Sequence, residues 1–417
     1  LALGVGAQEG QTAVLAQLRL ALDQPVRITM ADLVGQQCGA VIGLAPQDAT
    51  FQAGDTINGL GGTDTFNITL VAAAPASTMP VPTTAFTNVE IINVTNLSAG
   101  TQNLDASKFT GATNINSDRG SVVSTFTNIE GTMAVGVTGN GVVVNGTNTF
   151  TYLGIADSAT LNLSGGTRGT NTVTLVGTGV TATTINSTGA ANVAGTIALP
   201  TTANSKLTIN ATTNLTTTGI TGFLSTASKI TVTGAATAVS LGTLAVNVAT
   251  LDASGLTSGG VIATLGASAS QLTPTITGGA GKDMITTGGA LTSGSVNAGG
   301  GTDDVLIVAN TAHLNSTTLG ARYTNFELLQ ANNGVTQDIA NISGITGVRV
   351  NGAATATGIT NLSATQAASA KVLAAAAGVV TLTLANAAGT SDKLVVTADD
   401  ELSTVSTISL AAPVLTG

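Results

Sequence analysis

The chain carries little charge and few aromatic rings. Lys and Arg number 12 and Asp and Glu 21, together 8% of 417 residues, where roughly 25% is ordinary for a soluble domain. Eight Phe and two Tyr are the only aromatic residues, and Trp is absent. The net charge of −9 argues against nucleic acid as a partner, because phosphates are bound by clustered Lys and Arg. The acidic balance suits the binding of cations.

Histidine and cysteine are almost absent as well. The single His313 excludes a metalloprotease helix with two His ligands, and no G-x-S-x-G elbow accompanies it. We expect His313 to be a loop residue. The single Cys38 excludes intrachain disulfides and Cys-cluster metal sites, and we expect it to be a small buried hydrophobic residue. The sequence therefore predicts no enzymatic activity, although a glycosidase with a carboxylate pair needs no motif and stays open.

Long apolar runs are also missing. The mean hydropathy of +0.42 is high because charges are few. The most apolar candidate, residues 372–384, is interrupted by Gly378, Thr381 and Thr383. We find no run of about 18 apolar residues and expect no transmembrane segment. Residues 379–384 alternate as a half-buried strand does.

The first fifty residues have a helical pattern. Leu15, Leu18 and Leu22 recur at helical spacing before Pro25. Residues 29–32, Thr-Met-Ala-Asp, are typical of a capping box and predict the start of a second helix. We expect residues 1–50 to be a small N-terminal helical segment, either a cap on the first strands or the end of a helical domain.

After residue 47 the sequence changes to short Val, Ile, Leu and Thr alternations separated by Gly, Asn and Ser. Residues 172–176, 206–210 and 229–233 are examples. Such strands, punctuated by Thr-Gly and Asn-Gly turns, indicate an all-β region. Without large aromatic residues a wide sandwich core is hard to fill, whereas a solenoid needs only a narrow core in which each coil contacts its neighbours. The predicted fold is mainly β and resembles a β-solenoid or β-roll.

A pentapeptide of the form [Phe/Tyr]-Thr-Asn-[Val/Ile/Phe]-Glu occurs three times, at residues 86–90, 126–130 and 323–327. We expect its aromatic and aliphatic residues to fill the solenoid core. Its glutamates, Glu90, Glu130 and Glu327, are either metal ligands or, as we favour, solvent-exposed residues at strand ends.

Two of these copies follow a turn rich in Gly and Asp at similar distances. Asp64 precedes Glu90 by 26 residues, and Asp303 precedes Glu327 by 24. The spacing predicts a duplicated module at about 53–115 and 278–350. We therefore divide the chain after the helical segment into residues 51–270, with the first turn cluster and a long repetitive β region, and 271–417, with the second cluster and a β module.

The turns themselves have a recognisable pattern. Residues 278–286, GGAGKDMIT, match G-G-x-G-x-D-x-U-x at every position, and residues 298–305 match it with Ala298 in place of the first Gly. In the first cluster, Asp55 and Asp64 lie nine residues apart, each followed two positions later by a large apolar residue. Ordinary Gly-Asp hairpin turns are the alternative interpretation.

This spacing suits a hard cation. Glycine permits the positive φ that turns backbone carbonyls toward one point, and the Asp side chain reaches the same point. We expect the next nine-residue unit to add an equivalent set from the facing turn, giving about six oxygen donors, the environment that Ca²⁺ prefers. Asp392 and the acidic residues 399–401 are possible additional ligands. The candidate metal-binding residues are Asp55, Gly59, Gly61, Gly62, Asp64, Gly279, Gly281, Asp283, Gly299, Gly301, Asp303 and Asp304.

With residues 278–308, 324–327 and 381–392, the chain resembles the calcium-binding RTX surface-layer proteins of Gram-negative bacteria, most closely those of the Caulobacter type. The resemblance implies type I secretion, folding on meeting Ca²⁺, and a two-dimensional lattice on the outer membrane. It implies that the aspartates of the candidate set, with their neighbouring glycines, are calcium ligands. It also implies attachment to lipopolysaccharide, through a region that we expect to lie outside this chain, as we expect of the secretion signal.

We therefore expect a secreted structural subunit of a calcium-dependent surface layer or sheet-like matrix. Its partners would be copies of itself, in a lattice or filament on the cell surface. The alternative is an RTX adhesin or the non-catalytic calcium-binding roll of a type I-secreted protein. An adhesin for glycans would usually present exposed aromatic residues for stacking on sugars, and this chain has few aromatics to offer.

Overall fold

The computed structural model of the chain describes residues 27–29, 37–42, 56–70, 77–78, 86–98, 100–200, 205–223, 227–266, 274–352, 355–373, 379–386, 393–398 and 414–416. It is mainly β, with 51% strand and 6% helix, and its parallel strands stack as a β-solenoid of about 13 turns. The predicted fold class is confirmed. The chain separates into two compact units, Leu1–Leu224 and Ser225–Gly417. The predicted division at residues 50 and 270 stays a prediction.

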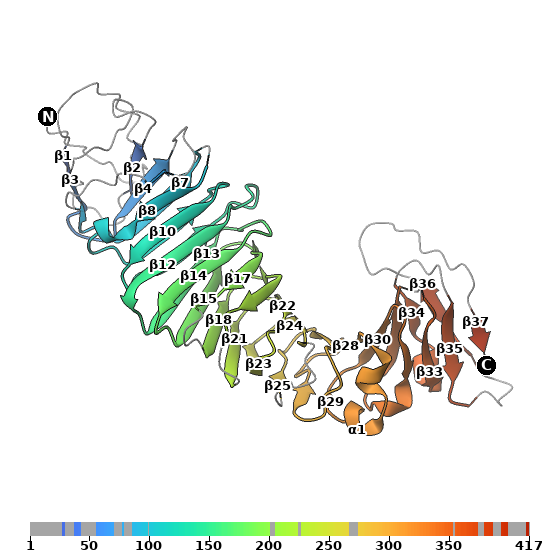
Figure 1. Cartoon of the computed structure of the whole chain (residues 1–417). Helices are drawn as coiled ribbons and strands as arrows, with labels where there is room; N and C mark the ends of the chain where they lie inside the picture. The colour runs from blue at the N-terminus through green and yellow to red at the C-terminus, as the bar shows by residue number, and fades with distance from the viewer. Residues whose placement is uncertain are drawn as a thin grey trace. The chain divides into compact units, whose positions relative to one another are not determined.

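In the first unit, one sheet receives a strand from each successive coil, where a coil is one full turn of the solenoid (Figure 1). All its pairings are parallel. The strands of this sheet, in order, are β2 (Gln37–Ile42), β4 (Thr65–Leu70), β7 (Ile91–Asn96), β9 (Asn114–Asp118), β11 (Ala134–Thr138), β13 (Ser158–Ser164), β15 (Ala182–Thr188) and β18 (Lys206–Ala211).

Further parallel strands form the other sides of the same coils. Three make a short sheet: β1 (Arg27–Thr29), β3 (Thr56–Asn58) and β6 (Phe86–Thr87). The remainder are β5 (Ser77–Thr78), β8 (Gln102–Asp105), β10 (Ser124–Ile129), β12 (Asn148–Ile155), β14 (Val173–Thr178), β16 (Asn192–Val193), β17 (Thr196–Ala198), β19 (Leu215–Thr216) and β20 (Gly219–Thr221). One 3₁₀ helix, η1 (Ala106–Lys108), follows β8.

The second unit repeats this arrangement. One side is formed by β21 (Ser228–Gly234), β23 (Val248–Leu256), β25 (Thr275–Thr277), β27 (Ser295–Asn297) and β29 (Tyr323–Thr324). Another is formed by β22 (Ala238–Thr243), β24 (Gly260–Thr264), β26 (Met284–Thr286), β28 (Val305–Val308), β30 (Leu328–Asn332), β32 (Gly347–Asn351), β34 (Ala370–Val372) and β36 (Val396–Ala398).

A four-stranded sheet completes the second unit: β31 (Thr336–Asp338), β33 (Thr357–Leu362), β35 (Val380–Leu384) and β37 (Val414–Thr416). Its helices are short: η2 (Thr311–Leu314), α1 (Thr317–Gly320), η3 (Ile339–Asn341) and α2 (Ala364–Ala367). Over the described ranges no helix has both the length and the apolar character needed to cross a bilayer.

The core is a set of inward-facing columns. The strands alternate buried and half-buried residues, as in β4, so one face of each strand is removed from water. Phe66 pairs in register with Ile92, and Ile92 with Ile115, all three fully buried. A coil takes 26 residues from Thr65 to Ile91 but only 20 from Asn114 to Ala134. The strands therefore keep register while the corners vary in length.

Aromatic residues of the pentapeptide fill this core, as predicted. Phe86, Phe126 and Tyr323 are at most 2% exposed. The ring of Phe126 stacks on that of Phe150 in the next coil, with centroids 4.9 Å apart and planes 11° from parallel. Such a pair adds about 0.5–1.5 kcal/mol beyond the burial of its area. The few aromatic residues of the pentapeptide therefore lie in the core, where one ring fills the space of several smaller side chains.

The predicted strands 172–176, 206–210, 229–233 and 379–384 correspond to β14, β18, β21 and β35. The two predicted N-terminal helices lie outside the described residues, as does the side chain of Cys38. The described parts of the first fifty residues, β1 and β2, are strands.

One corner is long and exposed. Residues 139–147 join β11 to β12, and Asn140 Oδ1 accepts hydrogen bonds from the backbone N–H groups of Val142 and Val143, at 3.0 and 2.9 Å. This closes the corner upon itself and leaves Val142 74% exposed.

Candidate functional site

The two glycine–aspartate turns of the second unit lie on the same side of the solenoid. Residues 278–283 join β25 to β26, and residues 298–304 join β27 to β28. Met284 pairs with Val305, so the turns stack one coil apart. The expectation of facing turns was wrong, because the 21 residues from Asp283 to Asp304 make a complete coil rather than half of one.

Three carboxylates follow one another along this stack, and we call Asp283, Asp304 and Glu327 the acid column. Asp283 Oδ1 accepts a hydrogen bond from the backbone N–H of Val261, at 2.7 Å. Asp304 Oδ1 accepts one from the N–H of Asp283, at 2.7 Å, and Glu327 Oε2 accepts one from the N–H of Asp304, at 3.0 Å. Each acid thus binds the backbone of the preceding coil at the point where a strand begins.

The first unit contains the same arrangement. Thr65 pairs with Ile91, and Glu90 Oε2 accepts a hydrogen bond from the backbone N–H of Asp64, at 2.8 Å. Asp64 is fully buried. The turn that carries it, residues 59–64, also supplies Gly59, Gly61 and Gly62 of the candidate set. Asp55 lies outside the described residues, as do Asp392 and residues 399–401.

The pentapeptide closes each cluster. Asn88 and Asn325 adopt left-handed backbone conformations, with φ of 54° and 60°. The side-chain amide of Asn88 donates to Asn58 Oδ1 at 3.0 Å, and that of Asn325 donates to Asn297 Oδ1 at 2.8 Å. In three residues, Asn-Val-Glu or Asn-Phe-Glu, the chain makes the corner that a glycine–aspartate turn makes in six or seven. Glu90 and Glu327 therefore occupy the position of the aspartates, which sequence reasoning did not recognise.

The third copy of the pentapeptide has a different partner. Asn128 also has positive φ, 55°, but its amide donates to Asp105 Oδ1 at 3.0 Å. Asp105 is the N-cap of η1, and Glu130 is exposed, as favoured from sequence. The same pairing recurs between Asn361 and Asp338, the N-cap of η3, at 2.8 Å. Residues 359–362, Ile-Thr-Asn-Leu, are thus a fourth, degenerate copy that lacks the glutamate.

In the second turn, the buried acid is one residue later than the motif match suggests. Asp304 is 1% exposed and pairs in position with Asp283, whereas Asp303 is exposed. The turn is one residue longer than residues 278–283, and Gly299 and Gly301, with φ of 94° and 145°, take up the extra length. The aspartate equivalent to Asp283 is therefore Asp304.

Glycines of the turns are held at close quarters. A Cβ atom at Gly59 would lie 1.8 Å from the carbonyl oxygen of Asn88, and one at Gly279 would lie 2.1 Å from that of Gly259. At Gly281 the nearest atom, the carbonyl oxygen of Ser258, would be 2.7 Å away. Successive turns therefore stack backbone against backbone, which no larger residue permits.

Burial makes these carboxylates weak acids. The pKa of Asp283 is raised to about 7, chiefly by desolvation and in smaller part by the charge of Asp304, against the opposing effect of the backbone hydrogen bonds. The pKa of Asp304 is likewise raised to about 6, chiefly by desolvation, and repulsion from Glu327 and Asp303 contributes to this value. A positive charge placed beside the column would relieve both effects.

The donor chemistry of these turns fits a hard cation, since carboxylates and glycine carbonyls offer oxygen only. Asp283 and Asp304, with the carbonyls of the stacked turns, are the residues that would hold it. Asp283 Oδ1 accepts the N–H groups of both Val261 and Gly279, whereas Oδ2 accepts only that of Gly279, at 3.0 Å, and has a second lone pair for a metal. Across the residues described, no three His, Cys, Asp or Glu side chains gather closely enough to make a metal site alone. Backbone carbonyls would have to complete the coordination.

His313 belongs to η2 rather than to a loop. Its Nδ1 lies 2.8 Å from Thr287 Oγ1, and burial lowers its pKa. Its hydrogen bond joins η2 to the residue that follows β26, so its role in the structure is to hold a corner.

Comparison with protein-family models gives no match for this chain, and comparison with curated proteins gives none either.

Proposed function

We propose that the chain is a structural subunit of an extracellular, calcium-dependent surface layer or sheet-like matrix, assembled from copies of itself on a bacterial surface. We assign it no catalytic activity. The observation that carries the proposal is the acid column, in which carboxylates, two of them buried, recur at stacked glycine-rich turns of a β-solenoid. The resemblance to RTX surface-layer proteins supplies the cellular setting, including secretion and attachment to lipopolysaccharide through another region.

The role of the ion follows from the electrostatics of the column. Asp283 and Asp304 are buried. The charge of Asp304 raises the pKa of Asp283. The charges of Glu327 and Asp303 raise the pKa of Asp304. A bound Ca²⁺ would compensate their charge and stabilise the folded coils relative to the unfolded chain. At a Ca²⁺ concentration about 100 times its Kd, binding to the folded state alone adds about 2.7 kcal/mol.

Negative-stain microscopy of the purified chain with Ca²⁺, and again after a chelator, tests the assembly. We expect ordered sheets or filaments that dissolve on chelation. Calcium-bound monomers at every protein concentration would instead support the alternative, an RTX adhesin or the calcium-binding roll of a larger secreted protein. Stability and assembly that are the same with Ca²⁺ and with chelator would overturn the proposal of a calcium-dependent layer.

A pair of variants separates site-specific binding from loss of charge. Asp283→Asn with Asp304→Asn removes two charges from the acid column and should abolish the rise in Tm on adding Ca²⁺. Asp157→Asn with Glu130→Gln removes two exposed charges elsewhere and should leave it intact. Asp303→Asn, alone, tells whether the exposed neighbour is a ligand: we expect it to reduce the calcium shift less than Asp304→Asn does.

A further inference from the structure

Seven successive coils of the first unit place equivalent outward residues in one column. The pairings of β4, β7, β9, β11, β13, β15 and β18 are in register at this position. Asparagine occupies six of the seven places. The column is Asn67, Asn93, Asn116, Gly136, Asn162, Asn186 and Asn210.

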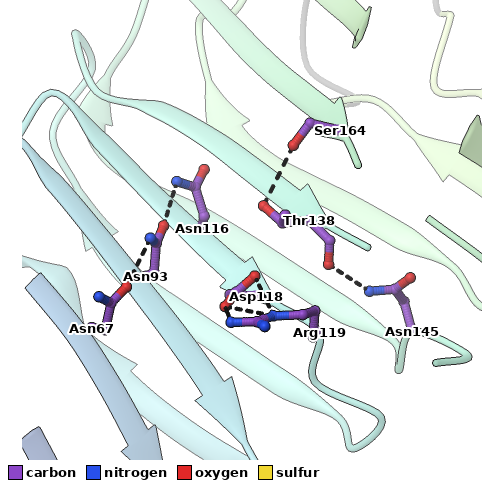
Figure 2. A network of polar contacts seen from close by, with 8 residues as sticks. All are labelled: Asn67, Asn93, Asn116, Asp118, Arg119, Thr138, Asn145 and Ser164. Carbon is purple, nitrogen blue, oxygen red and sulfur yellow. Dashed lines mark hydrogen bonds and ion pairs between the residues drawn. The ribbon is translucent and has the colours of Figure 1, made fainter. Parts of the chain in front are cut away.

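The asparagines are linked by side-chain hydrogen bonds along the stack. Figure 2 shows Asn93 between Asn67 and Asn116: its amide donates to Asn67 Oδ1 at 3.0 Å, and its own Oδ1 accepts from Asn116 at 2.9 Å. Such amide ladders form where identical side chains repeat in register on parallel strands. Each Nδ2 group donates to the preceding coil, so the ladder has a direction.

A second ladder follows beyond a single glycine. Asn186 donates to Asn162 Oδ1 at 2.8 Å, and Asn210 donates to Asn186 Oδ1 at 2.9 Å. Between the ladders, a Cβ atom at Gly136 would lie 2.2 Å from Asn116 Oδ1. The glycine therefore gives room to the last amide of the first ladder.

Two further columns flank the asparagines and are dominated by threonine. We call the three columns together the polar face. One flanking column is Thr65, Ile91, Asn114, Ala134, Thr160, Thr184 and Thr208. The other is Thr69, Thr95, Asp118, Thr138, Ser164 and Thr188.

The polar face is electrically neutral, although the chain has a net charge of −9. Its one charged side chain, Asp118, is 7% exposed and forms an ion pair with Arg119 (Figure 2). Two copies that approach by any acidic part of their surface repel each other, whereas two polar faces meet without that cost. Threonine hydroxyls remain to donate and accept between copies, and the threonine methyl groups exclude water.

We propose that the polar face is the surface by which one copy of this chain docks on a second copy within the assembly. The inference rests on the proposed layer function and names one of its contacts.

The contact between two polar faces is small. Six strand spacings of about 4.8 Å by five residues of about 3.3 Å give on the order of 500 Å² per copy, below the ~800 Å² per partner of a stable pair. It therefore holds only where several contacts act together, as in a lattice.

Thr160→Lys with Thr184→Lys tests this docking by placing two charges on adjacent coils of the polar face. Thr149→Lys with Thr174→Lys is the matched control, because these paired threonines are equally half-buried and lie on β12 and β14. With Ca²⁺ present, we expect the control to form sheets like the unaltered chain, and the polar-face variant to need at least tenfold more protein. Sheets of unchanged spacing at unchanged concentration in the polar-face variant would overturn the proposal. Equal unfolding curves would show that both variants fold.

Cross-linking keeps the docking testable if the unaltered chain forms no sheets, an outcome that would count against the layer itself. Cys38→Ser removes the only thiol, and Thr184→Cys or Thr174→Cys then places one on either side. A short bismaleimide should link copies through Cys at position 184 at high protein concentration and not at position 174. Equal linking or none at both overturns the proposal. Retention of the chain on cross-linked dextran through the polar face, without linked copies, would assign the face to a neutral glycan and overturn it also.

Discussion

The side chain of Glu90 reaches back one coil and accepts a hydrogen bond from the backbone N–H of Asp64, 2.8 Å from Oε2. Glu327 does the same for Asp304 in the second unit. Each of these N–H groups lies where a strand begins, beside a turn that offers it no backbone acceptor. The carboxylate accepts its hydrogen bond in place of water or a backbone carbonyl. The two glutamates act as caps between coils.

Truncating these caps should destabilise the unit to which each belongs. We expect Glu90→Ala to lower the free energy of unfolding by about 1–2 kcal/mol, since a charged acceptor is lost from a half-buried N–H. Urea denaturation measures it. Glu130→Ala is the control: its residue is exposed and should change stability by less than about 0.5 kcal/mol. Equal effects at positions 90 and 130 would show that Glu90 is not a cap.

The stability of the second unit should decrease as the pH rises from about 4 to about 7. Asp283 and Asp304 have pKa values of about 7 and about 6 in the folded chain, above the 3.8 of an unperturbed Asp. The folded state therefore binds more protons than the unfolded state between these values, and its stability falls as pH rises through that window. In chelator, Tm should be higher at pH 5 than at pH 8.

Asp283→Asn should flatten that pH dependence, because the amide oxygen can still accept the N–H of Val261 without titrating. Calcium should flatten it too, if the ion binds at the column. A Tm profile in chelator that is level between pH 5 and pH 8 would contradict the raised pKa values.

Below about pH 4 an opposite trend is expected from Asp252, whose pKa is lowered chiefly by a hydrogen bond from the Ser254 side chain.

The left-handed asparagines should tolerate glycine better than alanine. At Asn325, φ is 60°, which costs a residue with a Cβ about 1–2 kcal/mol unless the side chain compensates. Asn325→Gly removes the side-chain hydrogen bond to Asn297 but relieves the strain of the backbone. Asn325→Ala removes the same hydrogen bond and keeps the strain. We expect the alanine variant to be less stable by about 1 kcal/mol in denaturant titrations. An alanine variant as stable as the glycine variant would mean that the backbone is not strained there.

The amide ladder should contribute to stability as well as to the surface. Asn93→Ala removes two side-chain hydrogen bonds at the middle of the first ladder, and we expect a loss of about 1–2 kcal/mol, since a net hydrogen bond is worth roughly 0.5–1.5 kcal/mol. Thr95→Ala, two residues later on the same face, should cost less. Thermal unfolding compares them, and the reverse order would show that the amides contribute nothing along the stack.

The solenoid was predictable because its cause is local. Short β-branched strands between Gly and Asn corners, with too few aromatic residues for a wide core, leave little alternative to stacked narrow coils. The burial of Phe86, Phe126 and Tyr323 followed from the same reasoning and is confirmed. Whether the turns bind Ca²⁺ stays a prediction.

What the sequence did not reveal depends on which coil lies against which. Asp304 rather than Asp303 occupies the position of Asp283, because the turn is one residue longer, and a motif match carries no information on stacking. The asparagine column was missed for the same reason. From Asn67 the next places lie 26, 23, 20, 26, 24 and 24 residues on, so no fixed period reveals it.

The corner at residues 139–147 has a practical consequence. Because Asn140 closes it through Val142 and Val143, and Val144 is 53% exposed, added sequence between Val143 and Val144 would project outward while β11 and β12 keep their neighbours. An epitope or a small folded cargo grafted there should be displayed without loss of cooperativity in unfolding. The corner that would display an insertion is thus separate from the strands that hold successive coils together.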